Sequence, residues 1–381
     1  MDWQLPDEIE LLRKTVRDFV VERLQPIEQQ VEDEDRIPED VLAEMAKLGF
    51  FGLPFPEEYG GAAAGDLGYC VALEEFGRTS AAFSNLIGAH TSIGSMSIFL
   101  GGTDDQKRRY LPDLTAGRKI AAFSLTEPSS GSDAASIQTT ARKDGDRWLL
   151  NGTKIWVTNG PIADVVVVYA ANDRSLGARG ITAFIVEKGF TGFRVGRVDE
   201  KMGLRGSYTA ELVFEDCEVP DDNVLGGTIG SGFRTALGAL DIGRVSLAAG
   251  AVGSSQHLLE LATAHAKRRV QFGKPIAANQ AVQWMLADSA VEIHAARLMV
   301  YDAAAKLDRG RRVSREAAMV KVFASEMAGR VADRALQVLG GMGYMKGSPV
   351  ERAYRDARIL RIYEGTSEVQ RMIIAEDLLK A

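Results

Sequence analysis

The 381-residue chain is long enough for two or three domains, and its composition, 46% apolar and 25% charged, is typical of a globular protein. A net charge of −7, with no long run of lysine and arginine, argues against a duplex-binding surface, so we expect no nucleic-acid partner. Cys70, Cys217 and the four histidines fit no metal-ligand spacing, so we expect no bound metal.

The start of the chain is acidic and lacks the basic and apolar regions of a signal peptide. No apolar run approaches the length that a membrane-spanning helix needs. The sequence therefore predicts a soluble, cytoplasmic protein with no membrane span.

Helical periodicity dominates residues 1–117. Apolar residues recur at spacings of three and four from Leu5 to Val20, and Pro26 is predicted to end or kink that helix. The same period predicts helices at 41–48, 67–77 and 84–100. The last of these is almost uncharged, which indicates burial on most sides.

Residues 118–230 change to runs rich in β-branched and aromatic residues, at 164–170, 181–186 and 210–219. Residues 148–158 are predicted to form two strands around an Asn151-Gly152 turn, which is a strong hairpin signal. These patterns predict a compact β-domain.

The helical period returns after residue 231 and predicts long helices at about 232–267, 278–308 and 314–339, then shorter ones at 349–358 and 366–379. The predicted fold is therefore α+β. It comprises an N-terminal helical domain (1–117), a middle β-domain of short strands resembling a barrel (118–230) and a C-terminal four-helix bundle (231–381).

Several common catalytic motifs are absent from the sequence. The glycine cluster at 340–343 follows a helix and lacks the last glycine of GxGxxG, which disfavours a Rossmann dinucleotide site. No complete P-loop and no GxSxG elbow is present, so nothing indicates an NTPase or a serine hydrolase.

Four segments, in this order and separation, resemble the acyl-CoA dehydrogenase family. They are residues 123–133 (FSLTEPSSGSD), 269–275 (RVQFGKP), 337–344 (QVLGGMGY) and 362–368 (IYEGTSE). The resemblance implies FAD-dependent oxidation of an acyl-CoA thioester to the trans-2-enoyl-CoA, with electrons passed to an electron-transfer flavoprotein. It also implies a homotetramer, built as a dimer of dimers.

The resemblance also implies which residues bind FAD. Leu125, Thr126, Trp156 and Thr158 would lie at the flavin ring, although a turn and a core tryptophan would explain these residues equally well without it. Further implied FAD contacts are Phe272, Thr366 and Glu368, and a group that reaches the FAD of a neighbouring subunit: Arg269, Gln280, Gln337, Gly340 and Gly341. Arginine suits this role because its guanidinium forks onto paired phosphate oxygens.

Glu364 is implied to be the catalytic base that takes the α-proton. Its apolar neighbours and the adjacent Gly365 predict a raised pKa, since apolar burial disfavours the charged carboxylate. The implied substrate contacts are Ser132, Asp241, Arg244 and Gly365. Asp241 and Arg244 would otherwise be an i, i+3 surface ion pair worth only about 0.2–0.5 kcal/mol.

Two positions distinguish branches of the family. Some branches carry the base where this chain has Gly243, and the glutaryl-CoA branch has an arginine near Ser84, so Glu364 here indicates the short- and medium-chain branches. The acyl pocket is expected to be lined by Ser84, Leu86, Ile87, Thr91, Ser92, Ser95 and Met96. An acyl-CoA oxidase that uses oxygen, and a non-catalytic flavin- or CoA-binding assembly protein, remain as alternatives.

Overall fold

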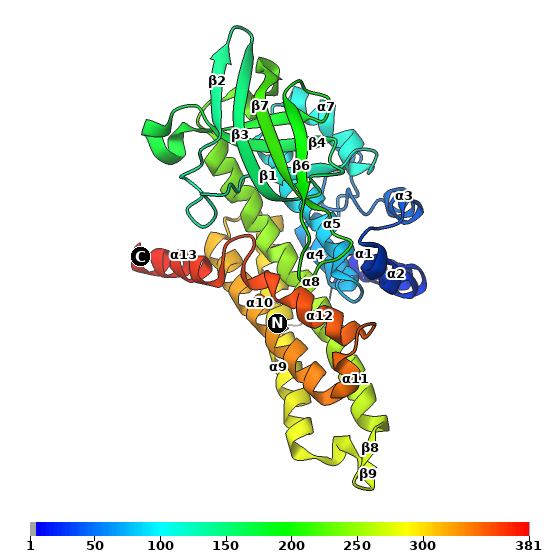
Figure 1. Ribbon diagram of the computed structural model, residues 1–381. Coiled ribbons are helices and arrows are strands. Elements are labelled where there is room, and N and C mark those ends of the chain that lie inside the picture. Colours follow the sequence, from blue (N-terminus) through cyan, green and yellow to red (C-terminus); the bar gives the residue numbers. More distant parts are fainter. Residues whose placement is uncertain (1–4, 381) are drawn as a thin grey trace.

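The computed structural model describes residues 5–380; residues 1–4 of the predicted N-terminal domain and Ala381 lie outside the described residues. Figure 1 shows the sheet at one end of the molecule and three long helices running away from it: α8 (Gly232–Arg268), α9 (Gln280–Asp308) and α10 (Ser314–Leu339). The predicted α+β class, with helices before and after a β-region, is confirmed. The domain boundaries at 117/118 and 230/231 stay predictions.

The N-terminal region is helical, as its periodicity predicted. Its α-helices are α1 (Asp7–Phe19), α2 (Glu28–Glu34), α3 (Glu39–Lys47), α4 (Gly65–Phe76), α5 (Ala81–Gly88), α6 (Met96–Gly101) and α7 (Asp104–Thr115). The expected kink at Pro26 is confirmed, because a π-turn (Val20–Leu24) and a 3₁₀-turn (Gln25–Ile27) separate α1 from α2. The predicted helix at 84–100 is interrupted by a π-helix, η4 (Ala89–Ser95). Such interruptions are frequent at functional sites.

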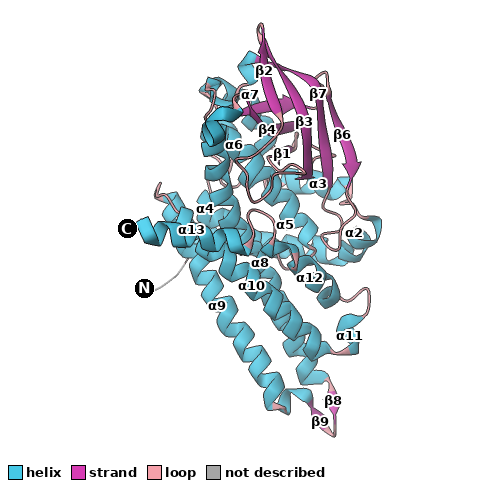
Figure 2. Ribbon diagram, turned by 60° about the vertical axis from the view of Figure 1, so that its left-hand side comes forward, coloured by secondary structure: helices cyan, strands magenta, loops and turns pink. Residues whose placement is uncertain are grey.

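One seven-stranded sheet forms the middle region. Its strands are β1 (Ala121–Ser124), β2 (Thr140–Asp144), β3 (Arg147–Thr158), β4 (Val165–Ala171), β5 (Ile181–Glu187), β6 (Phe193–Val198) and β7 (Thr209–Pro220). Their order is β1-β4-β2-β3-β7-β6, and β5 also pairs with β4. β4 is buried on both faces, which explains its unbroken run of valines. Figure 2 shows the strands beside α6 and α7.

The predicted turn at Asn151-Gly152 is wrong. β3 continues through both residues, and the turn between β2 and β3 is at Gly145, whose φ is 64°. The pairing of β3 with β7 shifts register between Leu150 and Gly152. A Cβ at Gly152 would lie only 2.4 Å from Thr139 Oγ1, so this glycine permits a close contact and a bulge instead of a turn.

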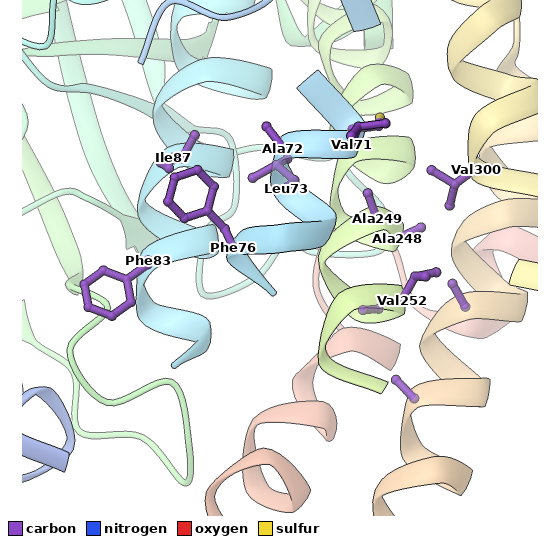
Figure 3. Close-up of a cluster of buried hydrophobic side chains, with 14 of the residues drawn as sticks. Val71, Ala72, Leu73, Phe76, Phe83, Ile87, Ala248, Ala249, Val252 and Val300 are labelled. Atoms are coloured by element: carbon purple, nitrogen blue, oxygen red, sulfur yellow. The ribbon is translucent and has the colours of Figure 1, made fainter. Parts of the chain in front are cut away.

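The C-terminal helices closely follow the predicted ranges. After α10 come α11 (Gly341–Tyr344), α12 (Pro349–Ala357) and α13 (Ser367–Lys380), and a two-stranded hairpin of β8 (Val270–Gln271) and β9 (Lys274–Pro275) joins α8 to α9. Figure 3 shows Phe76 of α4 beside Ile87 of α5, and Val252 of the neighbouring α8, all within one core cluster.

One apolar window was missed in the sequence. α8 is long and apolar enough to cross a membrane by length and composition, with a mean hydropathy of 1.3. That window is 67% buried within the chain, as is typical of a central core helix.

Candidate active site

Glu364 lies in the loop between α12 and α13, and its carboxylate faces α8. A Cβ placed on Gly243 of α8 would lie 2.7 Å from Glu364 Oε2 and 2.8 Å from Ile93 Cγ2. Three segments that are distant in sequence therefore meet at this carboxylate: the π-helix η4, the middle of α8 and the loop before α13. The absence of a side chain at Gly243 gives the carboxylate its space.

The backbone at Glu364 is held in an unusual conformation. Glu364 has φ 55°, a left-handed value that is uncommon for a residue other than glycine. Arg244 Nε and Gln370 Nε2 each donate to the Glu364 carbonyl at 3.1 Å. Lys321 Nζ donates to the Gly365 carbonyl at 2.6 Å, and Gln370 Nε2 donates to it at 3.1 Å. The loop is thus fixed by side chains from α8, α10 and α13.

The electrostatics of Glu364 suit a proton acceptor. Burial raises its pKa to about 7, and the charges of Arg244 and Lys321 oppose that rise. Glu364 Oε2 is buried and has no hydrogen-bond partner within residues 5–380. The raised pKa expected from its apolar neighbours is confirmed, and a carboxylate of this kind can take up and release a proton near neutral pH.

The pair of Asp241 and Arg244 is not a surface ion pair, because Arg244 is buried and the side chain of Asp241 is only 16% exposed. Arg244 is 4% exposed and its Nη1 lies 2.9 Å from Asp241 Oδ1, while its Nε bonds the Glu364 carbonyl. Ser314 also donates to the Asp241 carboxylate. Arg244 is therefore a support of the Glu364 loop, and its predicted contact with CoA stays a prediction, as does that of the exposed Ser132.

A second cluster is formed by the loop after β1 and the end of β3. Ile155 N donates to Thr126 O at 3.0 Å, which joins the two segments. Beside it, Trp156 occupies a β-bulge with φ 57°, and its side chain is 64% exposed. An exposed indole held in a strained backbone offers a flat face to a planar partner.

A buried ion pair fastens the same two segments together. Lys154 Nζ lies 2.7 Å from Glu127 Oε1 and donates to Leu125 O at 2.9 Å. The Glu127 carboxylate also accepts the backbone N–H groups of Gln138 and Thr139. Lys154 and Glu127 are 0% and 3% exposed, so this pair fixes the loop from inside.

This cluster fits the isoalloxazine ring of FAD. Trp156 presents an aromatic face, and Thr126 and Thr158 are only half-buried, leaving their polar groups accessible. The buried Ser124 Oγ and Asn159 Oδ1, adjacent in sequence to Leu125 and Thr158, lack a hydrogen-bond partner in the described part of the chain. FAD would supply such partners and a hydride acceptor.

Thr366 and Glu368, two of the predicted FAD contacts, follow Glu364 closely around the start of α13. The other remaining predicted FAD contacts lie far from the flavin cluster. Figure 1 shows the β8–β9 hairpin at the end of the molecule opposite the sheet. The 26 residues from Gly243 to Arg269 correspond to about 39 Å along α8. The exposed residues at this distal end are Arg269, Phe272, Gln280, Gln337, Gly340 and Gly341. Within one chain, the structure does not bring them to Trp156 or Glu364.

Comparison with known proteins identifies the family. Models of the acyl-CoA dehydrogenase N-terminal, middle and C-terminal domains match residues 6–118, 122–217 and 230–379. An acyl-CoA dehydrogenase from Bacillus subtilis (strain 168) is 47% identical over 369 residues, covering 97% of each chain. The chain belongs to the acyl-CoA dehydrogenase family. It is accordingly an FAD-dependent oxidoreductase that acts on acyl-CoA, as its motifs implied.

Two solved structures match this acyl-CoA dehydrogenase over 100% of both chains. Butyryl-CoA dehydrogenase from Megasphaera elsdenii is 41% identical with a TM-score of 0.97. A chain solved in work on the electron transferring flavoprotein of Acidaminococcus fermentans and flavin-based electron bifurcation is 42% identical with a TM-score of 0.98.

Several residues of this acyl-CoA dehydrogenase site were not predicted from the sequence. Lys321 and Gln370 hold the Glu364 loop, Ile93 lies at the carboxylate, and Lys154 and Glu127 fasten the flavin segments. Lys321 could have been recognised in the sequence, because it lies on the apolar face of α10. A lysine is rarely buried on such a face unless it has a specific partner. By contrast, Leu86 and Ile87, expected in the acyl pocket, pack in the main core cluster.

Proposed function

We propose that this acyl-CoA dehydrogenase oxidises a short-chain acyl-CoA across its α and β carbons, with Glu364 as the base. The observation that carries the proposal is the Glu364 carboxylate itself. It has a pKa of about 7, a buried oxygen without a hydrogen-bond partner among the described residues, and a neighbouring glycine that leaves space beside it. A carboxylate in that state is ready to accept a proton at neutral pH.

The residues of the chain divide the chemistry between them. Glu364 takes the α-proton through a carboxylate oxygen, and FAD, when bound, accepts the hydride that leaves the β-carbon. We assign the backbone N–H of Glu364 to the thioester carbonyl, where a donor stabilises the charge that develops as the proton leaves. Arg244, Gln370 and Lys321 keep that backbone fixed through the carbonyls of Glu364 and Gly365.

Two features favour a short acyl group. The relative from Megasphaera elsdenii is a butyryl-CoA dehydrogenase. Ile93 lies beside the carboxylate, and its neighbours on η4, Thr91, Ser92 and Ser95, are at most 1% exposed. Their hydroxyls are partly committed to the helix, since Thr91 donates to Phe51 O and Ser92 to Gly88 O. We propose that these residues form the wall of the acyl pocket and limit how far an acyl chain can extend.

A cavity near the N-terminus of α8 is a candidate site for the phosphate end of CoA. This cavity of about 270 Å³ is lined by Leu100, Gly101, Gly226, Thr228, Ser231, Arg234, Thr235 and Gly238. Arg234 is exposed and forms no ion pair with any described residue. It lies nine residues before Gly243, about 14 Å along the helix, which suits the length of the pantetheine arm.

Replacing Arg234 with Glu is expected to raise KM for acyl-CoA with little change in kcat. The matched Arg309→Glu, at the exposed end of α9, is expected to change neither.

A second subunit would complete each FAD site. The flavin cluster at Trp156 and the distal group at Arg269 are too far apart in one chain to bind one FAD molecule, so we propose that they meet across a subunit interface. The distal end also exposes Phe272 fully and Trp284 by 64%, which suits burial against another copy. On this basis we propose a homotetramer. We also propose that an electron-transfer flavoprotein is the electron acceptor. The cytoplasmic location stays a prediction.

An anaerobic titration tests the proposed function. The purified FAD-loaded protein is mixed with butyryl-CoA, and loss of the yellow flavin absorbance is followed, with hexanoyl-, isobutyryl- and glutaryl-CoA for comparison. We expect butyryl-CoA to bleach the flavin fastest. Reoxidation by oxygen that outpaces reoxidation by an electron-transfer flavoprotein would indicate an oxidase. A flavin that no acyl-CoA bleaches would indicate a binding protein and contradict the proposal.

A further inference from the structure

Lys321 is a buried lysine that is in contact with no carboxylate of the part of the chain that the structure describes. Its side chain is 0% exposed, and its Nζ donates to the Gly365 carbonyl at 2.6 Å. No carboxylate in residues 5–380 lies within 4.0 Å of this ammonium. The other fully buried lysine, Lys154, does have one, since it lies 2.7 Å from Glu127 Oε1.

The charged and titratable groups around this point come from four elements. On the catalytic loop and the start of α13, Glu364 and Glu368 attract the Lys321 ammonium, whereas Arg244 on α8 repels it. Arg244 already has a carboxylate partner, Asp241, at 2.9 Å, and Glu368 is exposed to solvent. Two tyrosines, Tyr363 on the loop and Tyr69 on α4, also face Glu364, but burial keeps both neutral by raising their pKa.

The negative charge left to balance Lys321 is therefore the Glu364 carboxylate. An unpaired buried charge is costly, so a buried lysine is retained where a nearby opposite charge compensates it. Here the two groups do not touch: the ammonium holds the peptide of Gly365, directly after the base. This arrangement leaves the carboxylate oxygens of Glu364 free for substrate, while the Lys321 ammonium stays near them at the Gly365 carbonyl.

We propose that Lys321 is a positioning residue and the electrostatic counterion of the catalytic base, holding Glu364 in its ionised form and its loop in the left-handed conformation. This inference rests on the proposed role of Glu364. When the α-proton moves to a Glu364 oxygen, Lys321 loses its counterion. That imbalance favours release of the proton once product has left, so Lys321 also helps to restore the base for the next turnover.

The pH dependence of the rate tests this inference, because a merely structural lysine would not move it. The base must be ionised, so kcat/KM falls as pH drops below the pKa of Glu364. In Lys321→Met the ionised carboxylate keeps Arg244 but loses the second of its two positive neighbours, so its pKa rises, and the acidic limb is expected to move upward by about 1 pH unit. Lys321→Arg keeps the charge and should leave the limb near its parent position. Ser325→Ala, which removes a buried hydroxyl group from the same helix, is the control and should not move it.

Each outcome separates this inference from the proposed function. If the acidic limbs of Lys321→Met and the parent superimpose while Glu364→Gln is inactive, the role proposed for Lys321 is wrong. The role of Glu364 as the catalytic base then still stands. If Glu364→Gln still reduces its flavin, the proposed function fails first. Should Lys321→Met not fold, the double variant Lys321→Met/Glu364→Gln removes both charges and is expected to fold. Misfolding of the double variant as well would overturn the pairing.

Discussion

The carboxylate of Glu364 lies where the side chain of residue 243 would be if that residue were not glycine. A Cβ at Gly243 would approach Glu364 Oε2 to 2.7 Å and Ile93 Cγ2 to 2.8 Å. The two positions at which branches of this family were expected to carry the base are therefore in contact in space. A base on either segment would reach the same point, and only one of the two positions can be filled.

Gly243→Ala is expected to impair catalysis without unfolding the protein. The methyl group would displace the Glu364 carboxylate or Ile93, and a shift of about 1 Å in a catalytic group can cost roughly 10²-fold in rate. The rate of flavin reduction by acyl-CoA measures the effect. Gly250→Ala, on the same helix, is the matched control, because its methyl would meet nothing closer than 3.8 Å. Equal rates for the two variants would show that the space at Gly243 is not needed.

The rate of flavin reduction is expected to rise with pH through about pH 7. Burial raises the pKa of Glu364 to about 7, and a protonated carboxyl cannot take a second proton. Below that pH the rate should therefore fall about tenfold per pH unit, and above it the rate should level off. Anaerobic stopped-flow measurements over a pH series, with far-UV circular dichroism to confirm folding, check this. A rate that does not change across this range would contradict a base of this pKa.

Lys154→Met is expected to weaken both folding and FAD binding. It leaves the buried Glu127 without its partner, and breaking one side of a buried pair typically costs about 3–5 kcal/mol. It also removes the hydrogen bond to the Leu125 carbonyl, which loosens the loop beside the flavin. Urea unfolding and fluorescence titration with FAD measure the two effects.

A lysine on the same sheet provides the control for that experiment. Lys143 is 41% exposed and pairs with Asp221 on the surface, so Lys143→Met should cost less than about 1 kcal/mol and leave FAD binding unchanged. If Lys154→Met behaved like Lys143→Met, the buried pair would have no part in shaping the flavin site.

Arg269→Glu is expected to release FAD and weaken subunit association together. Arg269 is exposed at the distal end, where a guanidinium suits the pyrophosphate of an FAD held by another subunit. Light scattering and the FAD dissociation constant would be measured on the same sample. The adjacent Arg268 is also exposed, and Arg268→Glu is the control for the change of charge. A monomer that retains FAD after Arg269→Glu would rule out a shared site.

The sequence predicted helices more accurately than the strand connections. The long periods of α8, α9 and α10 were located to within two residues at either end, because one apolar face persists over many turns. The Asn151-Gly152 dipeptide was misleading, since a glycine can serve a bulge as well as a turn. Local turn propensity cannot distinguish a bulge from a turn at Gly152, because the decisive contact is with Thr139 on a different segment.

Motifs located the segments of the site, but not what fixes them. Glu364 and Trp156 lie in recognisable stretches, whereas Lys321 and Gln370 act on the backbone carbonyls beside the base from other helices. A side chain that bonds a carbonyl distant in sequence leaves no local pattern. The raised pKa of Glu364 was predictable in direction from its apolar neighbours, but the opposing charges of Arg244 and Lys321 were not.

Anaerobic stopped-flow reduction of the flavin in Glu364→Gln tests the central claim most directly. Glutamine nearly preserves size and hydrogen bonding but cannot accept a proton, so FAD and acyl-CoA should still bind while reduction slows by at least about 10²–10⁴-fold. Glu368→Gln, four residues further on and exposed, is the control and should retain the chemistry even if it binds FAD less tightly. Flavin reduction in Glu364→Gln at close to the parent rate would contradict the account and place the base elsewhere.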